Sequence, residues 1–249
     1  MKKIAVITGA STGLGAEFLK QLPIQFPEIE EVWTIQRRPI QTSSGKIPVK
    51  EILLDLTERQ SFTHLKQIFA EQKPEIRLLI NNAGSGKIGN LADCNYEEQG
   101  CMIDLNNRAA TLLTALCLPY MARGAMILNV ASIAAFAPNP RMTVYSATKA
   151  YLLSFSKSLR EEIKPLGIHC TAICPGPMCT EFLSVAGIEK GTSKAFDTLP
   201  YCIPSKVAAQ ALKSVKRNRI LYTPRLFYKF YYILAKLLPH GLIMKISKT

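Results

Sequence analysis

Short apolar runs alternate with longer helical patterns along most of this chain. The runs are the length of buried strands, and the segments between them repeat their apolar residues at helical spacing. Strands are expected at Lys3–Thr8, Glu31–Gln36, Lys50–Leu54, Arg77–Asn81, Ala125–Ala131 and Ile168–Ile173, and a helix-and-strand pair at Ser205–Tyr222. Helices are expected at about 13–25, 58–72, 97–123 with a break near 102–105, and 144–165.

Strand, helix, strand in steady repetition is typical of an α/β fold with helices on both faces of a parallel sheet. The pattern predicts a doubly wound parallel sheet of about seven strands. No low-complexity linker or internal repeat divides the chain, so we expect one domain over residues 1–222. Residues 180–201 form a loop-rich insertion in it, and residues 223–249 form a C-terminal extension.

Composition narrows the class of protein. The 249 residues are 48% hydrophobic and 20% charged, which excludes a disordered chain. The seven cysteines include no C-x-x-C pair, which favours reduced thiols and a cytoplasmic protein. The N-terminal apolar run stops without a signal cleavage site, and no run reaches the roughly 20 residues of a membrane-spanning helix.

The charge is unevenly distributed. The net charge is +13, from 31 basic and 18 acidic residues, and no acidic residue follows Asp197. Most of the excess therefore belongs to the last fifth of the chain.

A glycine-rich segment follows the first strand. The sequence Thr8-Gly9-Ala10-Ser11-Thr12-Gly13-Leu14-Gly15 lies between a predicted strand and a predicted helix. Glycines there allow a tight turn and let a pyrophosphate approach the helix N-terminus. The segment therefore predicts a dinucleotide site, although a glycine-rich turn alone is weak evidence.

A phenol and an amine lie four residues apart in the segment Val144–Tyr151. Tyr145 and Lys149 share one face of a predicted helix. An ammonium beside a phenol favours the phenolate, so we expect Lys149 to lower the pKa of Tyr145 below its ordinary value of about 10. Taken alone, the pair favours a surface tyrosine and lysine on an amphipathic helix, because Y-x-x-x-K is a common pattern.

The motifs together resemble the short-chain dehydrogenase/reductase family. They are the glycine-rich segment, Asn81-Asn82-Ala83-Gly84, Ser132, Tyr145-x-x-x-Lys149 and Pro175-Gly176, in family order over about residues 3–222. The resemblance implies a Rossmann-like fold and an NAD(P)-dependent oxidoreductase.

The resemblance also implies catalytic roles. Tyr145 would be the general acid in carbonyl reduction and the base in alcohol oxidation, and Ser132 would hydrogen-bond the substrate oxygen. Lys149 would tune Tyr145 and bind the nicotinamide ribose. Asn106 matches the family's helix asparagine that holds a water in a proton relay, with Asn107 as the neighbouring alternative. No metal site is expected.

By the same resemblance, the cofactor would contact four stretches of the chain. These are the glycine segment (Gly9, Ser11, Thr12, Gly13, Leu14, Gly15), the adenine side (Asp55, Leu56), the loop after the fourth strand (Asn82, Ala83, Gly84) and the nicotinamide side (Pro175, Gly176, Met178, Thr180), with Tyr145 and Lys149. Asp55 could instead serve only to cap the following helix.

The end of the second strand favours NADP(H) over NAD(H). Family members that use NAD usually carry an acid there, whereas this chain has Gln36 followed by Arg37 and Arg38. Guanidinium groups match a 2′-phosphate, which a carboxylate would repel. The alternative is that both arginines are solvated loop residues.

The segment 224–238 predicts a cationic amphipathic helix, with Thr223 as N-cap and Pro224 in the first turn. Its apolar stripe is Leu226, Phe227, Phe230, Tyr231, Ile233, Leu234, Leu237 and Leu238, with Arg225, Lys229, Tyr232 and Lys236 opposite. The stripe could pack on the domain, close the substrate cleft or meet a second subunit. It could also lie on an anionic membrane surface. Nucleic acid is not an expected partner, because no motif for it is present.

Apolar side chains dominate the insertion at 180–201 and the loop after Ser132. By resemblance the insertion is a substrate lid, and apolar walls suit a lipophilic ketone or the corresponding secondary alcohol. Two alternatives stay open. One is a 3-oxoacyl-thioester reductase whose acidic carrier docks on the basic surface, and the other is a non-enzymatic NADP-binding sensor or scaffold. A homo-oligomer, dimer or tetramer, is expected by resemblance.

Overall fold

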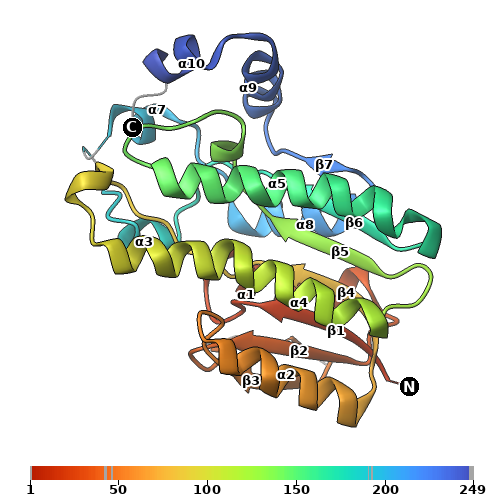
Figure 1. Cartoon of the computed structure of the whole chain (residues 1–249). Helices are drawn as coiled ribbons and strands as arrows, with labels where there is room; N and C mark the ends of the chain where they lie inside the picture. Colours follow the sequence, from red (N-terminus) through yellow and green to blue (C-terminus); the bar gives the residue numbers. More distant parts are fainter. Residues whose placement is uncertain (1, 42–43, 46, 190, 192, 247–249) are drawn as a thin grey trace.

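Seven strands form one parallel sheet in the computed structural model, which describes residues 2–41, 44–45, 47–189, 191 and 193–246 (Figure 1). Their order in the sheet is β3-β2-β1-β4-β5-β6-β7. The strands are β1 (Lys3–Thr8), β2 (Glu31–Gln36), β3 (Val49–Leu53), β4 (Glu75–Asn81), β5 (Met126–Val130), β6 (His169–Ile173) and β7 (Leu221–Tyr222). Every pairing is parallel, as the alternation of strands and helices predicts.

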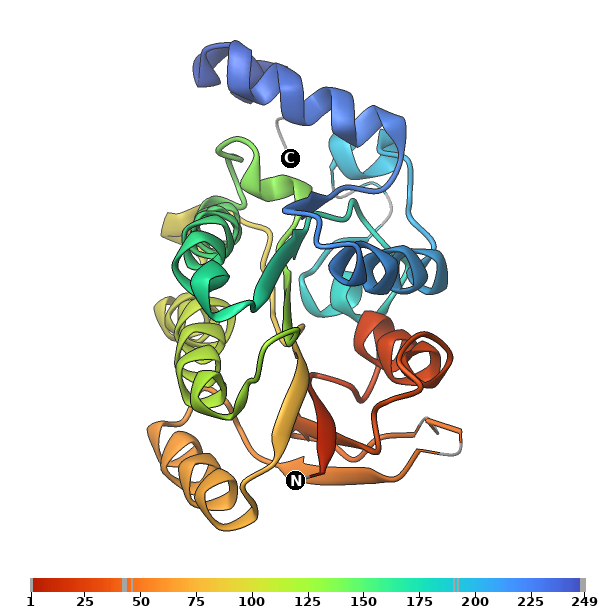
Figure 2. The same ribbon diagram turned by 90° about the vertical axis from the view of Figure 1, so that its right-hand side faces the viewer.

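Helices cover both faces of the sheet (Figure 2). One face carries α1 (Gly13–Gln25) and α8 (Pro204–Lys216), and the other carries α2 (Arg59–Gln72), α4 (Ala109–Cys117) and α5 (Thr143–Ile163). A separate apolar core fills each side, with Phe18 and Leu212 on the first and Phe69 and Leu113 on the second. The doubly wound Rossmann-like fold is thus confirmed.

The strand order reverses between β1 and β4. In open α/β sheets, ligands bind beyond the carboxyl ends of the strands at such a reversal. The glycine segment follows β1 and the Asn82 loop follows β4, so both meet at this point.

The helix expected at about 97–123 is not interrupted by a break. It runs as α3 (Tyr96–Ile103), a π-helical turn (Asp104–Arg108), α4 and a 3₁₀ turn (Leu118–Tyr120). One wide turn therefore replaces the break expected near 102–105, and such turns often occur at functional sites.

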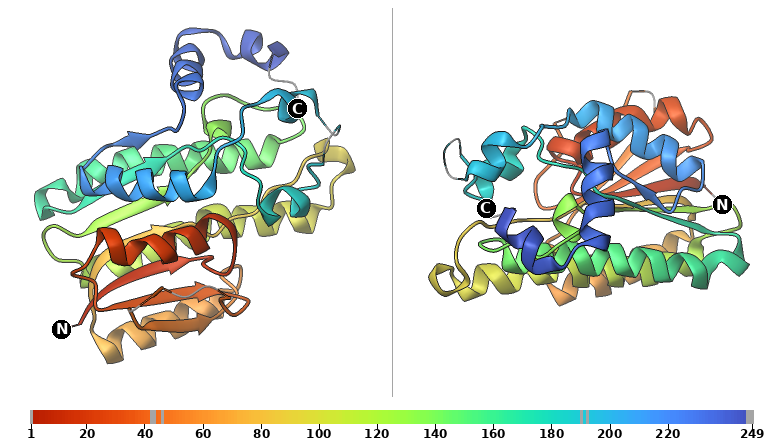
Figure 3. Two further views of the ribbon diagram at one scale, coloured as in Figure 1. Left: turned by 180° about the vertical axis from the view of Figure 1, so that it is seen from behind. Right: turned by 90° about the horizontal axis from the view of Figure 1, so that it is seen from above.

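The expected lid contains two short helices, α6 (Glu181–Val185) and α7 (Lys194–Thr198), and residues 190 and 192 of this insertion lie outside the described residues. The C-terminal extension forms α9 (Leu226–Leu237) and α10 (His240–Ile246), which lie across the β7 end of the molecule (Figure 3). None of the helices in the described ranges has the length and hydropathy to cross a bilayer.

The start of α9 differs from the sequence expectation. The helix begins at Leu226, and Arg225 before it adopts a left-handed backbone with φ 60°. Thr223 is therefore not the N-cap, and Pro224 lies outside the first turn. Arg225 also donates a hydrogen bond to the Tyr201 carbonyl, which ties this turn to the end of the lid.

Candidate active site

A cavity of about 570 Å³ lies at the carboxyl ends of the strands. Nearly all the residues expected from the sequence line it: Gly9, Ser11, Thr12, Gly13, Leu14, Arg37, Arg38, Asp55, Leu56, Asn82, Ala83, Gly84, Ser132, Tyr145, Lys149, Pro175, Gly176, Met178 and Thr180. Gly15 and Asn106 are both buried and are not among the residues that line it.

The glycine turn is built so that side chains would not fit. Gly9 and Gly13 have φ values of 68° and 58°, a conformation that favours glycine. A Cβ at Gly15 would lie 2.0 Å from the Gly9 carbonyl oxygen, so the turn and the start of α1 are in direct backbone contact. This cradle at a helix N-terminus is the geometry that binds a pyrophosphate.

Thr8 and Asn82 join the two loops at the strand reversal. The Thr8 hydroxyl accepts hydrogen bonds from the Asn82 and Ala83 amides at 3.0 and 2.9 Å. The Asn82 amide group donates to the carbonyls of Thr8 and Gly9, both at 3.0 Å. Asn82 therefore holds the cradle in shape through its own contacts.

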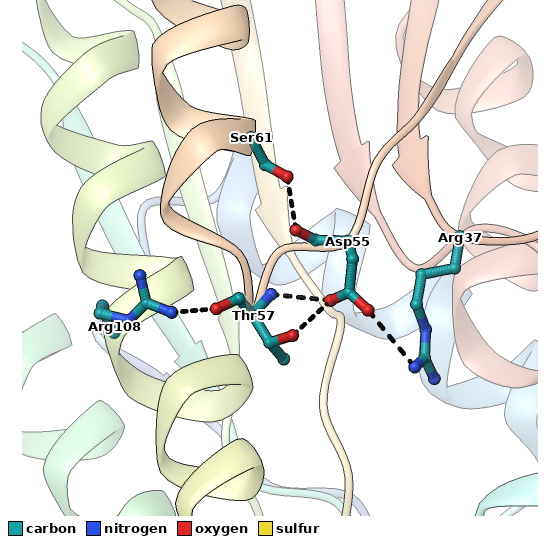
Figure 4. A network of polar contacts seen from close by, with 5 residues as sticks. All are labelled: Arg37, Asp55, Thr57, Ser61 and Arg108. Atoms are coloured by element: carbon teal, nitrogen blue, oxygen red, sulfur yellow. Dashed lines mark hydrogen bonds and ion pairs between the residues drawn. The ribbon is translucent and has the colours of Figure 1, made fainter.

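Asp55 belongs to the polar network in Figure 4. Its carboxylate accepts from the Thr57 amide at 2.8 Å and hydroxyl at 2.7 Å, and lies 3.5 Å from an Arg37 nitrogen. Burial raises the pKa of Asp55, but these hydrogen bonds and the Arg37 charge lower it more, so the group stays ionised. Asp55 therefore accepts hydrogen bonds from Thr57 and also lines the cleft.

Arg38 contacts the first residue of the lid helix α6. Its guanidinium donates to the Glu181 carboxylate at 2.8 Å, and the two side chains are 66% and 54% exposed. The Arg38 hydrogen bond, with a further one from Thr12, lowers the pKa of Glu181. Glu181 therefore joins the lid, the glycine turn and the second strand, a contact that the sequence did not reveal.

Ser132 and Tyr145 form the polar centre of the cleft. Ser132 follows β5 and is the N-cap of a short 3₁₀ turn, Ile133–Ala135. Its hydroxyl accepts a hydrogen bond from the Ala134 amide at 3.1 Å. Tyr145 lies in the first turn of α5 and is 8% exposed. Burial raises the pKa of Tyr145 to about 12, although a hydrogen bond with Ser132 opposes this.

The expectation that the pKa of Tyr145 falls below its ordinary value is wrong, because burial raises it. Lys149 is itself buried, which lowers its own pKa to about 8, and its ammonium donates to the Val130 carbonyl at 3.0 Å. Its nitrogen lies 5.7 Å from the centre of the Tyr145 ring. Because desolvation outweighs attraction at both groups, each is shifted toward its neutral form.

Asn106 lies on the π-helical turn and bridges two elements. Its amide donates to the Ser85 carbonyl and the Thr148 hydroxyl, both at 2.9 Å, and its oxygen accepts from the Ser85 amide at 2.9 Å. A Cβ at Gly84 would lie 3.0 Å from this oxygen and 3.3 Å from the Lys149 nitrogen. Asn107 instead donates to the Thr148 carbonyl, so the geometry favours Asn106 as the residue beside Lys149.

Apolar side chains from the lid and from α9 line another part of the cavity. Phe182 from the lid packs against Tyr145, with ring centres 5.7 Å apart. Phe227 and Tyr231 from α9 also line the cavity. The sequence placed Tyr231 on the apolar stripe of this helix but did not reveal which residues reach the cleft.

The Pro175-Gly176 segment is held from outside by α9. Tyr228 is fully buried, and a Cβ at Gly176 would lie 2.4 Å from its ring. The Tyr228 hydroxyl donates to the Pro200 carbonyl at 2.7 Å. The tail helix therefore supports both the cofactor side and the lid side of the cleft.

Comparison with known proteins gives the family. The family model for short chain dehydrogenases matches residues 3–190. The chain belongs to the short-chain dehydrogenase family. It is 30% identical over 182 residues to an uncharacterised oxidoreductase of Staphylococcus epidermidis, covering 72% of this chain and 79% of the relative. It is also 33% identical over 196 residues to the uncharacterised oxidoreductase YusZ of Bacillus subtilis, covering 74% and 68%.

Two solved structures resemble the whole chain. A short-chain dehydrogenase from Sphingobium yanoikuyae in complex with NADPH has a TM-score of 0.80 and 25% identity, covering 98% of this chain and 95% of that one. A bulky-bulky ketone specific alcohol dehydrogenase from Comamonas testosteroni has a TM-score of 0.73 and 25% identity, covering 96% and 93%. Family membership makes this chain a nicotinamide-dependent oxidoreductase.

Proposed function

We propose that this short-chain dehydrogenase interconverts apolar ketones and secondary alcohols with NADP(H), with Tyr145 as the acid and base. The observation that carries the proposal is one continuous cleft with the glycine cradle at one end and the Ser132–Tyr145 pair under apolar walls at the other. The intact polar centre favours an enzyme over a sensor or scaffold, which would need no proton donor.

The cleft fits NADP(H). The left-handed glycines and the close Gly15–Gly9 contact leave the space that a pyrophosphate needs. Arg37 and Arg38 line the same cleft and can bind a 2′-phosphate, once Arg38 leaves Glu181. The Gln36 side-chain oxygen is buried without a hydrogen-bond partner among the described atoms, which suits a neutral contact with ribose or adenine.

The proton chemistry follows from the chain's own residues. When bound, the dihydronicotinamide supplies a hydride to the carbonyl carbon. The Tyr145 hydroxyl, protonated at neutral pH, gives its proton to the carbonyl oxygen, which Ser132 also hydrogen-bonds. Lys149 and Asn106 then lie where they can return a proton to Tyr145 through water and stabilise the phenolate. In oxidation, Tyr145 accepts the proton instead.

The substrate is proposed to be bulky and apolar. Phe182, Phe196, Leu199 and Tyr231 line the cavity around the polar centre. Such walls favour burial of hydrocarbon and leave the carbonyl oxygen as the one group to be hydrogen-bonded. The preference of the Comamonas testosteroni relative for bulky-bulky ketones is consistent with this substrate class.

We also propose a cytoplasmic homodimer with the domain boundary after residue 222. All seven cysteines are free and belong to the described residues, as reduced thiols would be. Leu112 on α4 and Tyr151 on α5 are 38% and 45% exposed, so these two helices present an apolar face to a second copy.

The test is turnover on a graded panel of ketones, from acetone to diaryl and steroid ketones, with NADPH or NADH. The proposal expects alcohol formation with NADPH, rising with apolar bulk, and at least tenfold slower turnover with NADH. A 3-oxoacyl thioester on an acidic carrier is included in the panel. Turnover of that thioester alone, lost at high salt, would replace the apolar-ketone proposal with the thioester reductase.

A further inference from the structure

Helix α9 is fixed to the protein by its inner face. Tyr228 packs on Gly176, and Tyr232 lies against Phe136 with ring centres 4.8 Å apart. The Tyr232 hydroxyl also accepts from the Lys157 ammonium at 3.0 Å. Three contacts to different elements thus determine which side of the helix turns outward.

The outer face of α9 is apolar. Leu226, Phe230, Ile233 and Leu237 are 80%, 60%, 52% and 75% exposed. Their spacing of four, three and four residues places them on one stripe, so they form a continuous patch. Contiguous exposed apolar patches on a soluble protein usually mark an interaction surface.

This arrangement refines the sequence expectation. Tyr231 does not belong to the outward stripe, because it turns into the cleft. Lys229 and Lys236 are exposed and flank the stripe on one side, rather than lying opposite to it. A helix with lysines beside an outward apolar stripe has the distribution of an interfacial helix.

Charge identifies the partner. The sequence from 198 to 249 carries ten basic residues and no acidic one. A second copy docked through the same stripe would bring lysines toward lysines, with no carboxylate from this segment to pair them. Anionic lipid headgroups supply the missing negative charge, and acyl chains accept the apolar stripe.

The same helix forms one side of the cleft entrance. Phe227 lines the cavity and is 54% exposed, and Val185 of the lid lines it and is 65% exposed. Figure 3 shows α9 and α10 together at the end of the molecule where the lid lies. A surface bound by the stripe would therefore adjoin the apolar rim of the cleft.

We propose that the outer face of α9 docks on an anionic lipid surface and places the cleft entrance there, so that an apolar substrate enters from the lipid. The entry step rests on the proposed function. The docking step does not, since it follows from the exposed stripe and the charge alone.

Docking is tested with purified full-length protein and sedimented vesicles of phosphatidylcholine, with or without phosphatidylserine. Wild type should bind the anionic vesicles and lose binding at high salt. Phe230→Asp with Ile233→Asp should weaken binding at least tenfold, and Lys229→Gln with Lys236→Gln severalfold. Ile24→Asp, on the 80% exposed position of α1, is the matched control and should bind as wild type does.

Two results would overturn docking. One is wild type that does not bind anionic vesicles, and the other is binding that Phe230→Asp with Ile233→Asp leaves unchanged. Light scattering tests the alternative that a second copy of this chain covers the stripe. A mass that halves in this variant, without vesicle binding by wild type, would assign the stripe to a second copy.

Entry is tested separately with two ketones that the enzyme reduces, one dissolved in water and one confined to the vesicles. The variant should retain wild-type turnover of the first and lose at least tenfold on the second. An equal loss of turnover on both ketones, or no loss on either, would refute entry from lipid. Absence of turnover on any ketone, with vesicle binding intact, would instead refute the proposed function.

Discussion

Lys149 makes a specific prediction about stability and pH. It is buried, and no carboxylate of the described residues forms an ion pair with it, so desolvation lowers its pKa from 10.5 to about 8. Between these two values the unfolded chain holds more protons than the folded chain. The free energy of unfolding must therefore rise with pH in this window, because the folded chain loses the Lys149 proton at a lower pH than the unfolded chain does.

The magnitude follows from the two pKa values. At pH 7.5 the buried amine costs the fold about 3 kcal/mol relative to a neutral group, and at pH 9 about 2 kcal/mol. The Lys149 contribution alone should then raise the free energy of unfolding by about 1 kcal/mol between these pH values. Cys170 and Cys174 contribute in the opposite direction above pH 9, because burial raises the pKa of each to about 12. The folded chain then holds more thiol protons than the unfolded chain, so their contribution to the free energy of unfolding falls as pH rises.

The assay is urea unfolding of wild type and Lys149→Met at pH 7.5 and 9, followed by tryptophan fluorescence of the buried Trp33. Subtracting the two proteins removes the other titrating groups. Wild type should gain about 1 kcal/mol more than Lys149→Met between the two pH values. Parallel pH profiles would show that Lys149 keeps its ordinary pKa in the fold and refute the burial argument.

Four other substitutions test the cleft. Arg38→Ala should weaken NADPH binding about 10- to 100-fold with little effect on NADH, and Glu181→Gln should strengthen NADPH binding a few fold, both by fluorescence titration. Gly176→Ala should cost about 1–3 kcal/mol in urea unfolding because its Cβ meets Tyr228, and the cost should shrink in a Tyr228→Leu background. Phe182→Ala should raise KM for a bulky ketone at unchanged NADPH affinity. Equal losses for NADPH and NADH, an unaltered Gly176→Ala stability, or an unchanged KM would each contradict the corresponding contact.

The sequence predicted the parts that depend on local pattern. β1, α1 and β2 begin and end where hydrophobic spacing places them, because these elements bury one continuous run or stripe. The glycine turn and the Tyr145–Lys149 pair were also visible, since each is contained within a few consecutive residues.

The rest depends on contacts between distant segments. The pKa of Lys149 is set by burial against β5, and Arg38 meets Glu181 across 143 residues of sequence. The helical spacing of α9 predicts a stripe but not its direction, which Tyr228 and Gly176 decide. Periodicity carries no information about such partners.

The central claim is that Tyr145 donates the proton in a ketone reduction that uses NADPH. The most direct test is a single turnover, with enzyme in excess over NADPH and a saturating apolar ketone, for wild type and Tyr145→Phe. The account predicts that wild type oxidises one NADPH to NADP+ for each ketone that it reduces to the alcohol. It predicts that Tyr145→Phe still binds NADPH but reacts about 10²- to 10⁴-fold more slowly. Undiminished turnover by Tyr145→Phe would contradict the account.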